Sequence, residues 1–254
     1  MANRVLCSVT LAALALLSGA NGTAFAATAN LSAVADTTLL QNNPNNNLGG
    51  HTNFAAGTMA NGLHSRALLE FNIAGSIPTN AIINSVSLTL NVTAAASQSA
   101  TFELHPMLAS WLEGNKTGQL GAPATTGEAT WNNRAAPGTA WGAAGGLAGT
   151  DFSATSGGSA FISTGTVLTF GSTSGLVADV QNWLLDPNGD FGWILLGQSE
   201  STINTARRFA SREDGSGAGP TLIIDYSPVP EPSTLGLLGL AAGIGCWFRR
   251  RRAT

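Results

Sequence analysis

The chain has few cysteines and few charged residues. Its two cysteines, Cys7 and Cys246, lie near the ends, so residues 27–227 contain none. That stretch can form neither a disulfide framework nor a cysteine-based zinc site. Charged residues make up 10% of the chain, whereas a typical globular protein has about 25%. Such a low charge excludes a coiled coil and a charge-rich disordered tail.

The charges within residues 27–227 are mostly negative. Six lysines and arginines stand against thirteen aspartates and glutamates, which gives a formal net charge of −7. A negative surface repels nucleic acid and anionic lipid head groups, so we expect neither as a partner. It also opposes binding of a strongly acidic polysaccharide unless cations bridge the two.

The N-terminus has the pattern of a secretory signal. Arg4 precedes an apolar run over residues 9–17, and Ala24 and Ala26 form an A-x-A cleavage site before Ala27. The alternative, a buried N-terminal helix, does not require these three features in this order. We therefore expect the first 26 residues to be removed on export.

The C-terminus, residues 228–254, carries a second targeting pattern. Pro230, Glu231 and Pro232 lie in a stiff, extended spacer, because each proline fixes its own φ and disfavours a helical predecessor. The uncharged run 235–248 predicts a transmembrane helix, although it is shorter than the roughly 20 residues of a full span. Four arginines follow and should hold this end in the cytoplasm: Arg249, Arg250, Arg251 and Arg252. We expect a temporary anchor in the inner membrane.

The Pro-Glu-Pro, the apolar run and the arginine cluster, in this order, resemble the PEP-CTERM sorting signal of Gram-negative bacteria. The resemblance implies processing by an exosortase and delivery to the cell surface or to an exopolysaccharide matrix. An ordinary C-terminal anchor would explain the helix and the arginines, but not the Pro-Glu-Pro.

Between its two ends the sequence predicts an all-β domain over residues 27–227. Residues 82–93 alternate, with Val86 and Leu88 on one face and Ser87 on the other. Shorter strands are expected at residues 66–71, 100–104, 167–170, 193–196 and 221–226. One short helix is indicated by apolar residues at helical spacing: Leu176, Val180, Trp183 and Leu184. Short strands separated by turns are typical of an antiparallel β-sandwich, here of jelly-roll type.

The order of several segments resembles the DNRLRE domain, a disaggregatase-related module placed among carbohydrate-binding modules. The matching segments are Ala35-Asp36-Thr37, Asn47-Leu48-Gly49, residues 66–71 and 82–92, Trp111-Leu112-Glu113-Gly114, Thr130-Trp131-Asn132-Asn133, Trp183, residues 191–196, Phe209-Ala210-Ser211-Arg212-Glu213 and residues 220–226. The resemblance implies a β-sandwich that binds glycans or serves as a surface module, and it brings no catalytic centre.

The residues between the two signals show no complete catalytic motif. The three histidines lack metalloprotease spacing, and no nucleophile elbow or phosphate loop is present. Glu103 and His105 would share one face of a strand, but a hydrogen-bonded structural histidine explains the pair more simply. We therefore predict no enzyme activity, no cofactor and no metal centre. A polysaccharide hydrolase or lyase is the alternative.

A structural calcium ion stays open. Asp186, Asn188 and Asp190 are spaced like the first half of an EF-hand loop, but the twelfth position is Gly197 where a bidentate glutamate is required. A polar turn before the next strand is the simpler interpretation. Acidic β-sandwiches can still hold calcium on scattered carboxylates.

Aromatic side chains are the candidates for sugar contacts, because the C–H face of a pyranose is apolar. Trp141 lies among glycines and alanines, and we predict that it forms an exposed stacking platform. Asn133 and Arg134 would supply hydrogen-bond donors beside it. For the other tryptophans of the domain, packing in the interior is the simpler interpretation: Trp111, Trp131, Trp183 and Trp193.

These patterns predict a secreted bacterial surface protein with one β-sandwich domain and a sorting tail. The leading function is non-catalytic glycan binding, or a structural role, in the exopolysaccharide or biofilm, with a surface or matrix polysaccharide as partner. The alternatives are a polysaccharide-degrading enzyme and a passive coat protein without a soluble ligand.

Overall fold

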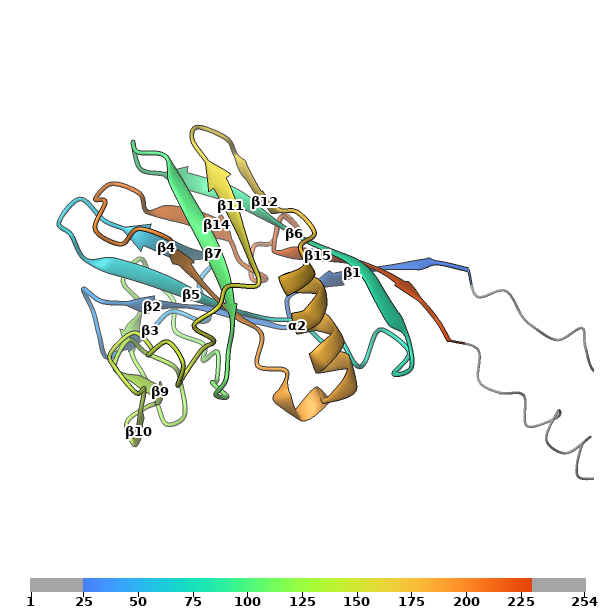
Figure 1. The fold of residues 1–254 in the computed structure, drawn as a ribbon. Coiled ribbons are helices and arrows are strands. Elements are labelled where there is room, and N and C mark those ends of the chain that lie inside the picture. The colour runs from blue at the N-terminus through green and yellow to red at the C-terminus, as the bar shows by residue number, and fades with distance from the viewer. Residues whose placement is uncertain (1–24, 230–254) are drawn as a thin grey trace, which may run out of the picture. The chain divides into compact units, whose positions relative to one another are not determined.

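Fifteen β-strands and one α-helix organise residues 25–229, which are the residues described by the computed structural model (Figure 1). The elements are β1 (Ala27–Ser32), β2 (Ala35–Leu40), β3 (Asn46–Asn47), β4 (Asn53–Thr58), β5 (His64–Glu70), β6 (Ile82–Ala95), β7 (Ala100–Pro106), β8 (Ala122–Pro123), β9 (Asn133–Ala135), β10 (Thr139–Ala140), β11 (Gly158–Ile162), β12 (Val167–Phe170), α2 (Ser174–Leu185), the 3₁₀ turn η2 (Pro187–Gly189), β13 (Trp193–Gly197), β14 (Arg207–Ala210) and β15 (Thr221–Ser227). Residues Ala27–Tyr226 form one compact unit.

Eleven of the strands form one curled antiparallel sheet. Their order is β1-β15-β6-β14-β4-β5-β13-β7-β11, with β12 beside β6 and β2 beside β5. The β4–β5 hairpin joins the two halves of this sheet, because Gly57 and Thr58 lie opposite Ser65 and His64. The sheet folds back on itself there, and one face of β6, β14 and β4 meets one face of β13, β7 and β11 across the main core.

Aromatic side chains fill the middle of the main core. The rings of Phe54 on β4 and Phe209 on β14 stack at 5.4 Å between centroids, and Phe102 on β7 meets Phe209 edge-on at 5.8 Å. Because side chains alternate along a strand, Asn53 and Arg208 point away from this core. They lie on the outer face of β4 and β14, where the pocket described below forms.

The helix α2 closes one end of the main core. Its predicted apolar residues, Leu176, Val180, Trp183 and Leu184, are buried, which confirms the helical spacing seen in the sequence. Thr173 caps the helix, since its Oγ1 accepts a hydrogen bond from the N–H of Leu176 at 3.1 Å. The rings of Trp183 and Trp193 meet edge-on, 4.5 Å apart.

A second core covers the outer face of β2, β5 and β13. Leu68 and Ile194 point away from the main core and would face water if nothing covered them. Side chains from residues 107–152 pack over them, including Trp131 and Trp141. Strands that are apolar on both faces require such a cover, because each buried side chain of this kind contributes roughly 1.5–3 kcal/mol of burial free energy.

The expectation of a mostly antiparallel β domain with one short helix is confirmed. Residues 1–24 of the expected signal, and the expected C-terminal helix 235–248 with Arg249–Arg252, lie outside the described residues. Ala27, the residue after the expected cleavage site, opens β1. Within residues 25–229, no helix has the length and apolarity needed to cross a membrane.

We expect Leu88→Asp to unfold the domain, because Leu88 is fully buried and the new carboxylate would have no partner in the core. The loss should exceed about 4 kcal/mol of unfolding free energy, measured by urea denaturation of residues 27–227. Ser87→Asp, on the opposite and half-buried face of β6, is the control and should change stability by less than about 1 kcal/mol. Equal effects of the two substitutions would contradict the assigned register.

Candidate functional site

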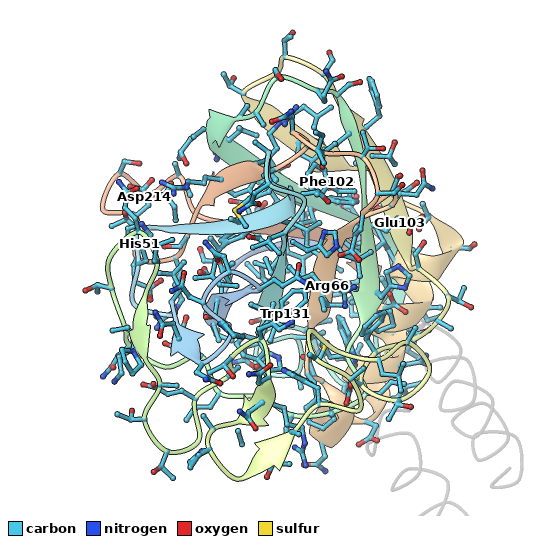
Figure 2. All side chains as sticks on the ribbon, turned by 90° about the vertical axis from the view of Figure 1, so that its left-hand side faces the viewer. His51, Arg66, Phe102, Glu103, Trp131 and Asp214 are labelled. Carbon is cyan, nitrogen blue, oxygen red and sulfur yellow. The ribbon has the colours of Figure 1, made fainter. Side chains whose placement is uncertain are left out.

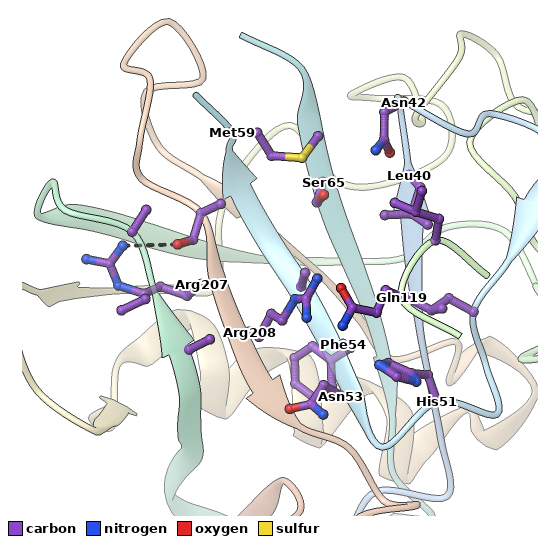
Figure 3. A pocket seen from close by; sticks show the side chains of 17 residues that line it. Leu40, Asn42, His51, Asn53, Phe54, Met59, Ser65, Gln119, Arg207 and Arg208 are labelled. Atoms are coloured by element: carbon purple, nitrogen blue, oxygen red, sulfur yellow. Dashed lines mark hydrogen bonds between the residues drawn. The ribbon is translucent and has the colours of Figure 1, made fainter. Parts of the chain in front are cut away.

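A pocket of about 320 Å³ lies on the outer face of β4 and β14 (Figure 3). Its other walls come from the end of β2, the loop between β2 and β4, the end of β6 and the loop before β8. Leu40, Leu48 and Met59 make part of it apolar, and short side chains at Ala55, Ala94 and Ala95 keep it open. The pocket exists because the curled sheet and these two loops enclose a strip of small residues.

Polar side chains line the same pocket. Asn53, Gln119, His51 and Asn42 supply amide or imidazole groups (Figure 3). Asn53 is held in place, because its Oδ1 accepts from the hydroxyl of Thr93 and its Nδ2 donates to the neighbouring Thr52 at 3.0 Å. The Oδ1 of Asn42 is shielded from solvent and has no hydrogen-bond partner.

Arg208 places a guanidinium in this pocket. Every other cationic side chain between residues 27 and 227 has a partner: Arg66 with Glu200, Lys116 with Glu128, Arg134 with Ser110, Arg207 with backbone carbonyls and Arg212 with Glu113. Within the described residues, the side chain of Arg208 makes neither a hydrogen bond nor an ion pair. Its five N–H groups are thus available to a ligand.

The neighbouring Arg207 has the opposite environment. It is 1% exposed, and its guanidinium donates to the carbonyls of Gln98 at 2.6 Å and Ser163 at 3.1 Å. Further bonds go to the carbonyls of Thr205 and Ala206. Burial lowers its pKa. Arg207 ties three loops together, and of its guanidinium nitrogens only the buried Nε has no hydrogen-bond partner.

His51 stays neutral in the pocket near pH 7. Burial lowers its pKa below the usual 6.5, and the positive charge of Arg208 lowers it further. A neutral imidazole presents one donor and one acceptor. The pocket therefore carries the free guanidinium of Arg208 and several neutral hydrogen-bonding groups, while the second guanidinium of its lining, that of Arg207, is bonded to backbone carbonyls.

The expectation that Trp141 is an exposed platform is wrong. Its side chain is 5% exposed and lies in the second core, where its Nε1–H donates to the carbonyl of Thr130 at 2.8 Å. Asn133 and Arg134 lie beside it in β9, but Arg134 reaches Ser110 and no ring face is open to them. The small residues next to Trp141, including Ala140, Gly142 and Ala143, are exposed, whereas the indole itself turns inward to the second core.

The other tryptophans are mostly interior. Trp131, Trp183 and Trp193 are buried, as expected. Trp111 is half-buried against the second core, and its Nε1–H donates to the carbonyl of Phe191 at 2.9 Å. Their indoles are used in packing.

Glu103 and His105 share one face of β7, as expected, with 3.4 Å between the carboxylate and Nε2. His105 is buried, and its Nδ1–H donates to the carbonyl of Ser153 at 2.8 Å. Its ring packs against Phe152. Both ring nitrogens have partners, so this is a hydrogen-bonded structural histidine.

A carboxylate cluster gathers three residues that are far apart in the sequence. Ligand-type oxygens of Asp36, Glu113 and Glu213 lie within 4.8 Å of one another. Arg212 sits among them: its Nε and Nη2 bond both oxygens of Glu113 at 2.6 and 2.5 Å, and Nη2 lies 2.9 Å from Glu213. Because the guanidinium already engages these carboxylates, the cluster does not fit a calcium ion.

Asp36 is the most perturbed carboxyl of this cluster. Its pKa is raised to about 8, and burial is the largest cause. The negative charges of Glu213 and Glu113 also raise the pKa, whereas the backbone N–H of Arg212, which donates to Oδ2 at 2.7 Å, lowers it. In the loop over residues 186–190, Oδ1 of Asp190 accepts a hydrogen bond from the N–H of Gly192 at 3.2 Å, and within residues 25–229 this loop is not part of any group of three clustered metal-ligand side chains. Burial raises the pKa of Asp190 to about 7.

Two known protein families match parts of this chain. Residues 27–145 match carbohydrate-binding module family 96, and residues 228–252 match the PEP-CTERM protein-sorting motif. The chain thus carries a family 96 carbohydrate-binding module and a PEP-CTERM sorting motif, as the two resemblances in the sequence implied. None of the curated proteins compared with the chain is similar enough to match it. The matched module includes Leu40 to Gln119 of the pocket, whereas Arg208 lies beyond it.

The titration of Asp36 should make the domain less stable at alkaline pH. The folded state holds this proton more tightly than the unfolded chain, where the pKa is near 3.8, so its stabilising effect is complete below pH 3.8 and lost as the pH rises through about 8. We expect the unfolding free energy to fall between pH 5 and 9, and Asp36→Asn to abolish a loss on the order of 3 kcal/mol. Chemical denaturation across this pH range measures it.

The control for this prediction is Asp186→Asn, at an exposed carboxylate outside the cluster. It should keep the wild-type pH profile. If Asp36→Asn also kept it, Asp36 would be ionised throughout the range, contrary to its burial.

Proposed function

We propose that this chain is an exported, non-catalytic carbohydrate-binding protein of the cell surface or exopolysaccharide matrix, and that the Arg208 pocket holds the glycan. The observation that carries the proposal is an unpaired guanidinium among amide groups over an apolar wall. Sugars present hydroxyl groups around an apolar C–H face, and such a wall complements both. The family 96 match supports carbohydrate as the ligand class.

The lining of the pocket supports binding rather than catalysis. Glycoside hydrolysis uses a pair of carboxyl groups that flank the scissile bond. None of the residues that line this pocket is an aspartate or a glutamate. A volume of about 320 Å³ is at the lower end of small-molecule sites, which span about 300–1,000 Å³. It suits one or two sugar rings of a neutral or weakly acidic glycan.

The sorting motif supports the proposed location. In this proposal the signal over residues 1–26 is removed, the β-domain over residues 27–227 is an opened jelly-roll sandwich, and residues 228–254 serve as spacer, temporary inner-membrane anchor and exosortase substrate. Ala27 pairs with Tyr226, so the domain begins and ends at one place. The β2–β3 and β4–β5 loops that border the pocket lie at the opposite end of the fold (Figure 1). These loops are therefore at the end of the β-domain that is remote from Ala27 and Tyr226.

We expect Arg208→Ala to weaken glycan binding about 10- to 100-fold, because hydrogen bonds from a charged donor are worth about 1.5–3 kcal/mol. Affinity electrophoresis in gels containing exopolysaccharide from the producing cells measures the change. Arg134→Ala is the matched control, since it removes a surface guanidinium outside the pocket. Unchanged retention of Arg208→Ala, with wild type retained, would exclude the pocket as the binding site.

Replacing Pro230, Glu231 and Pro232 by alanines should leave the full-length chain in the inner membrane, because the sorting motif would lack its Pro-Glu-Pro. Fractionation and immunoblotting of cells that produce each form measures the location. Delivery of the altered chain to the surface at the wild-type level would contradict processing by an exosortase.

A further inference from the structure

The outer face of β7 and β11 carries an exposed aromatic side chain. Phe161 is 67% exposed, and it is the only exposed aromatic residue between positions 27 and 229. Its neighbours on β11, Ala160 and Ile162, point into the main core, so alternation directs Phe161 outwards. The ring of Phe161 is not part of the main core. It therefore presents an apolar surface to water that no other side chain in the described part of the chain covers.

Polar groups lie directly beside this ring. Phe161 is opposite Thr101 on β7, and the carbonyl of Thr101 accepts the N–H of Gln198 at 2.9 Å. The three residues form one row across β11, β7 and the end of β13, which we call the Phe161 surface. Thr101 and Gln198 also line a cavity of about 110 Å³ together with the hydroxyl groups of Ser99, Ser199 and Thr202.

The Gln198 side chain is oriented by its neighbour. Its Nε2 donates to Oε1 of Glu103 at 2.9 Å, and the other oxygen of Glu103 faces His105 at 3.4 Å. The side-chain amide oxygen of Gln198, Oε1, is then left as a hydrogen-bond acceptor, and the residue is exposed. Neither the row nor the lining of the cavity contains a lysine or an arginine, and Glu103 lies next to them. This surface therefore offers nothing to an acidic polymer.

We infer that the Phe161 surface is a second glycan-binding site, which takes a neutral sugar by stacking its C–H face on Phe161 and bonding its hydroxyls at Gln198 and the adjoining cavity. An exposed ring beside ordered amide and hydroxyl groups is the chemistry that a pyranose requires. It differs from the Arg208 pocket, which has a cation and no exposed aromatic ring.

The two sites face away from each other. Arg208 and Asn53 alternate with core residues on one side of the main core, whereas Phe161 and Glu103 do so on the other. In Figure 2, His51 of the pocket and Glu103 beside the Phe161 surface lie on opposite sides of the molecule. One domain can therefore hold two separate glycan chains and bridge them, which is a cross-linking activity beyond single-site binding.

The test uses the full chain in mild detergent and three neutral polysaccharides as probes: hydroxyethylcellulose, galactomannan and dextran. Affinity electrophoresis compares wild type with Phe161→Ala. We expect at least one probe to retain wild type, and Phe161→Ala to bind it about 5- to 100-fold more weakly, as for other single stacking contacts. Val167→Ala, which trims an exposed apolar residue of β12, is the control and should bind like wild type.

Arg208→Ala separates this inference from the proposed pocket. It should keep the Phe161-dependent retention, and the double variant should lose binding at both sites. If no neutral probe is retained in a Phe161-dependent way, the inference is overturned, whatever Arg208→Ala does. It is also overturned if light scattering shows a wild-type dimer that Phe161→Ala converts to a monomer, because a second copy would then cover the ring.

Discussion

The structure depends on the need of β5 and β13 to bury both of their faces. One face of each strand contributes to the main core, and the other presents Leu68 and Ile194. Residues 107–152 have to lie over that second face, and this draws Trp131 and Trp141 inside. The same segment brings Glu113 to the edge of β2, where it meets Arg212 and Asp36. The same segment covers the outer face of β4 and β14 only in part, and the pocket forms there between the sheet and Gln119 and Leu120.

Local patterns predicted the parts of the fold that depend on one strand or helix. The alternation over residues 82–93 became β6, and the apolar spacing from Leu176 to Leu184 became α2. Each pattern indicates which face of the strand or helix is buried, but it does not indicate which other element packs against that face. They could not reveal that the sheet closes through the β4–β5 hairpin into a single curled sheet, because this depends on pairing between strands far apart in the sequence.

The candidate site was harder to predict for the same reason. Arg207 and Arg208 are adjacent and identical, and alternation predicts only that they face opposite ways. Backbone carbonyls from three loops bury Arg207, and nothing in the described chain engages Arg208. Trp141 is not a platform, because its turn-rich surroundings do not determine whether the indole itself points outward or into the second core. The exposed ring is Phe161, whose strand shows an ordinary alternating pattern.

The pairing of Ala27 with Tyr226 has a mechanical consequence. A domain held through its C-terminal end, while a glycan is bound at the other end of the fold, is loaded in tension along β15. This strand lies between β1 and β6, and its hydrogen bonds run across the direction of pull. The six residue pairs between β1 and β15 then share the load in shear, instead of opening one after another. Pairing with the edge strand β1 thus opposes the extraction of β15 when the C-terminal end of the domain is pulled.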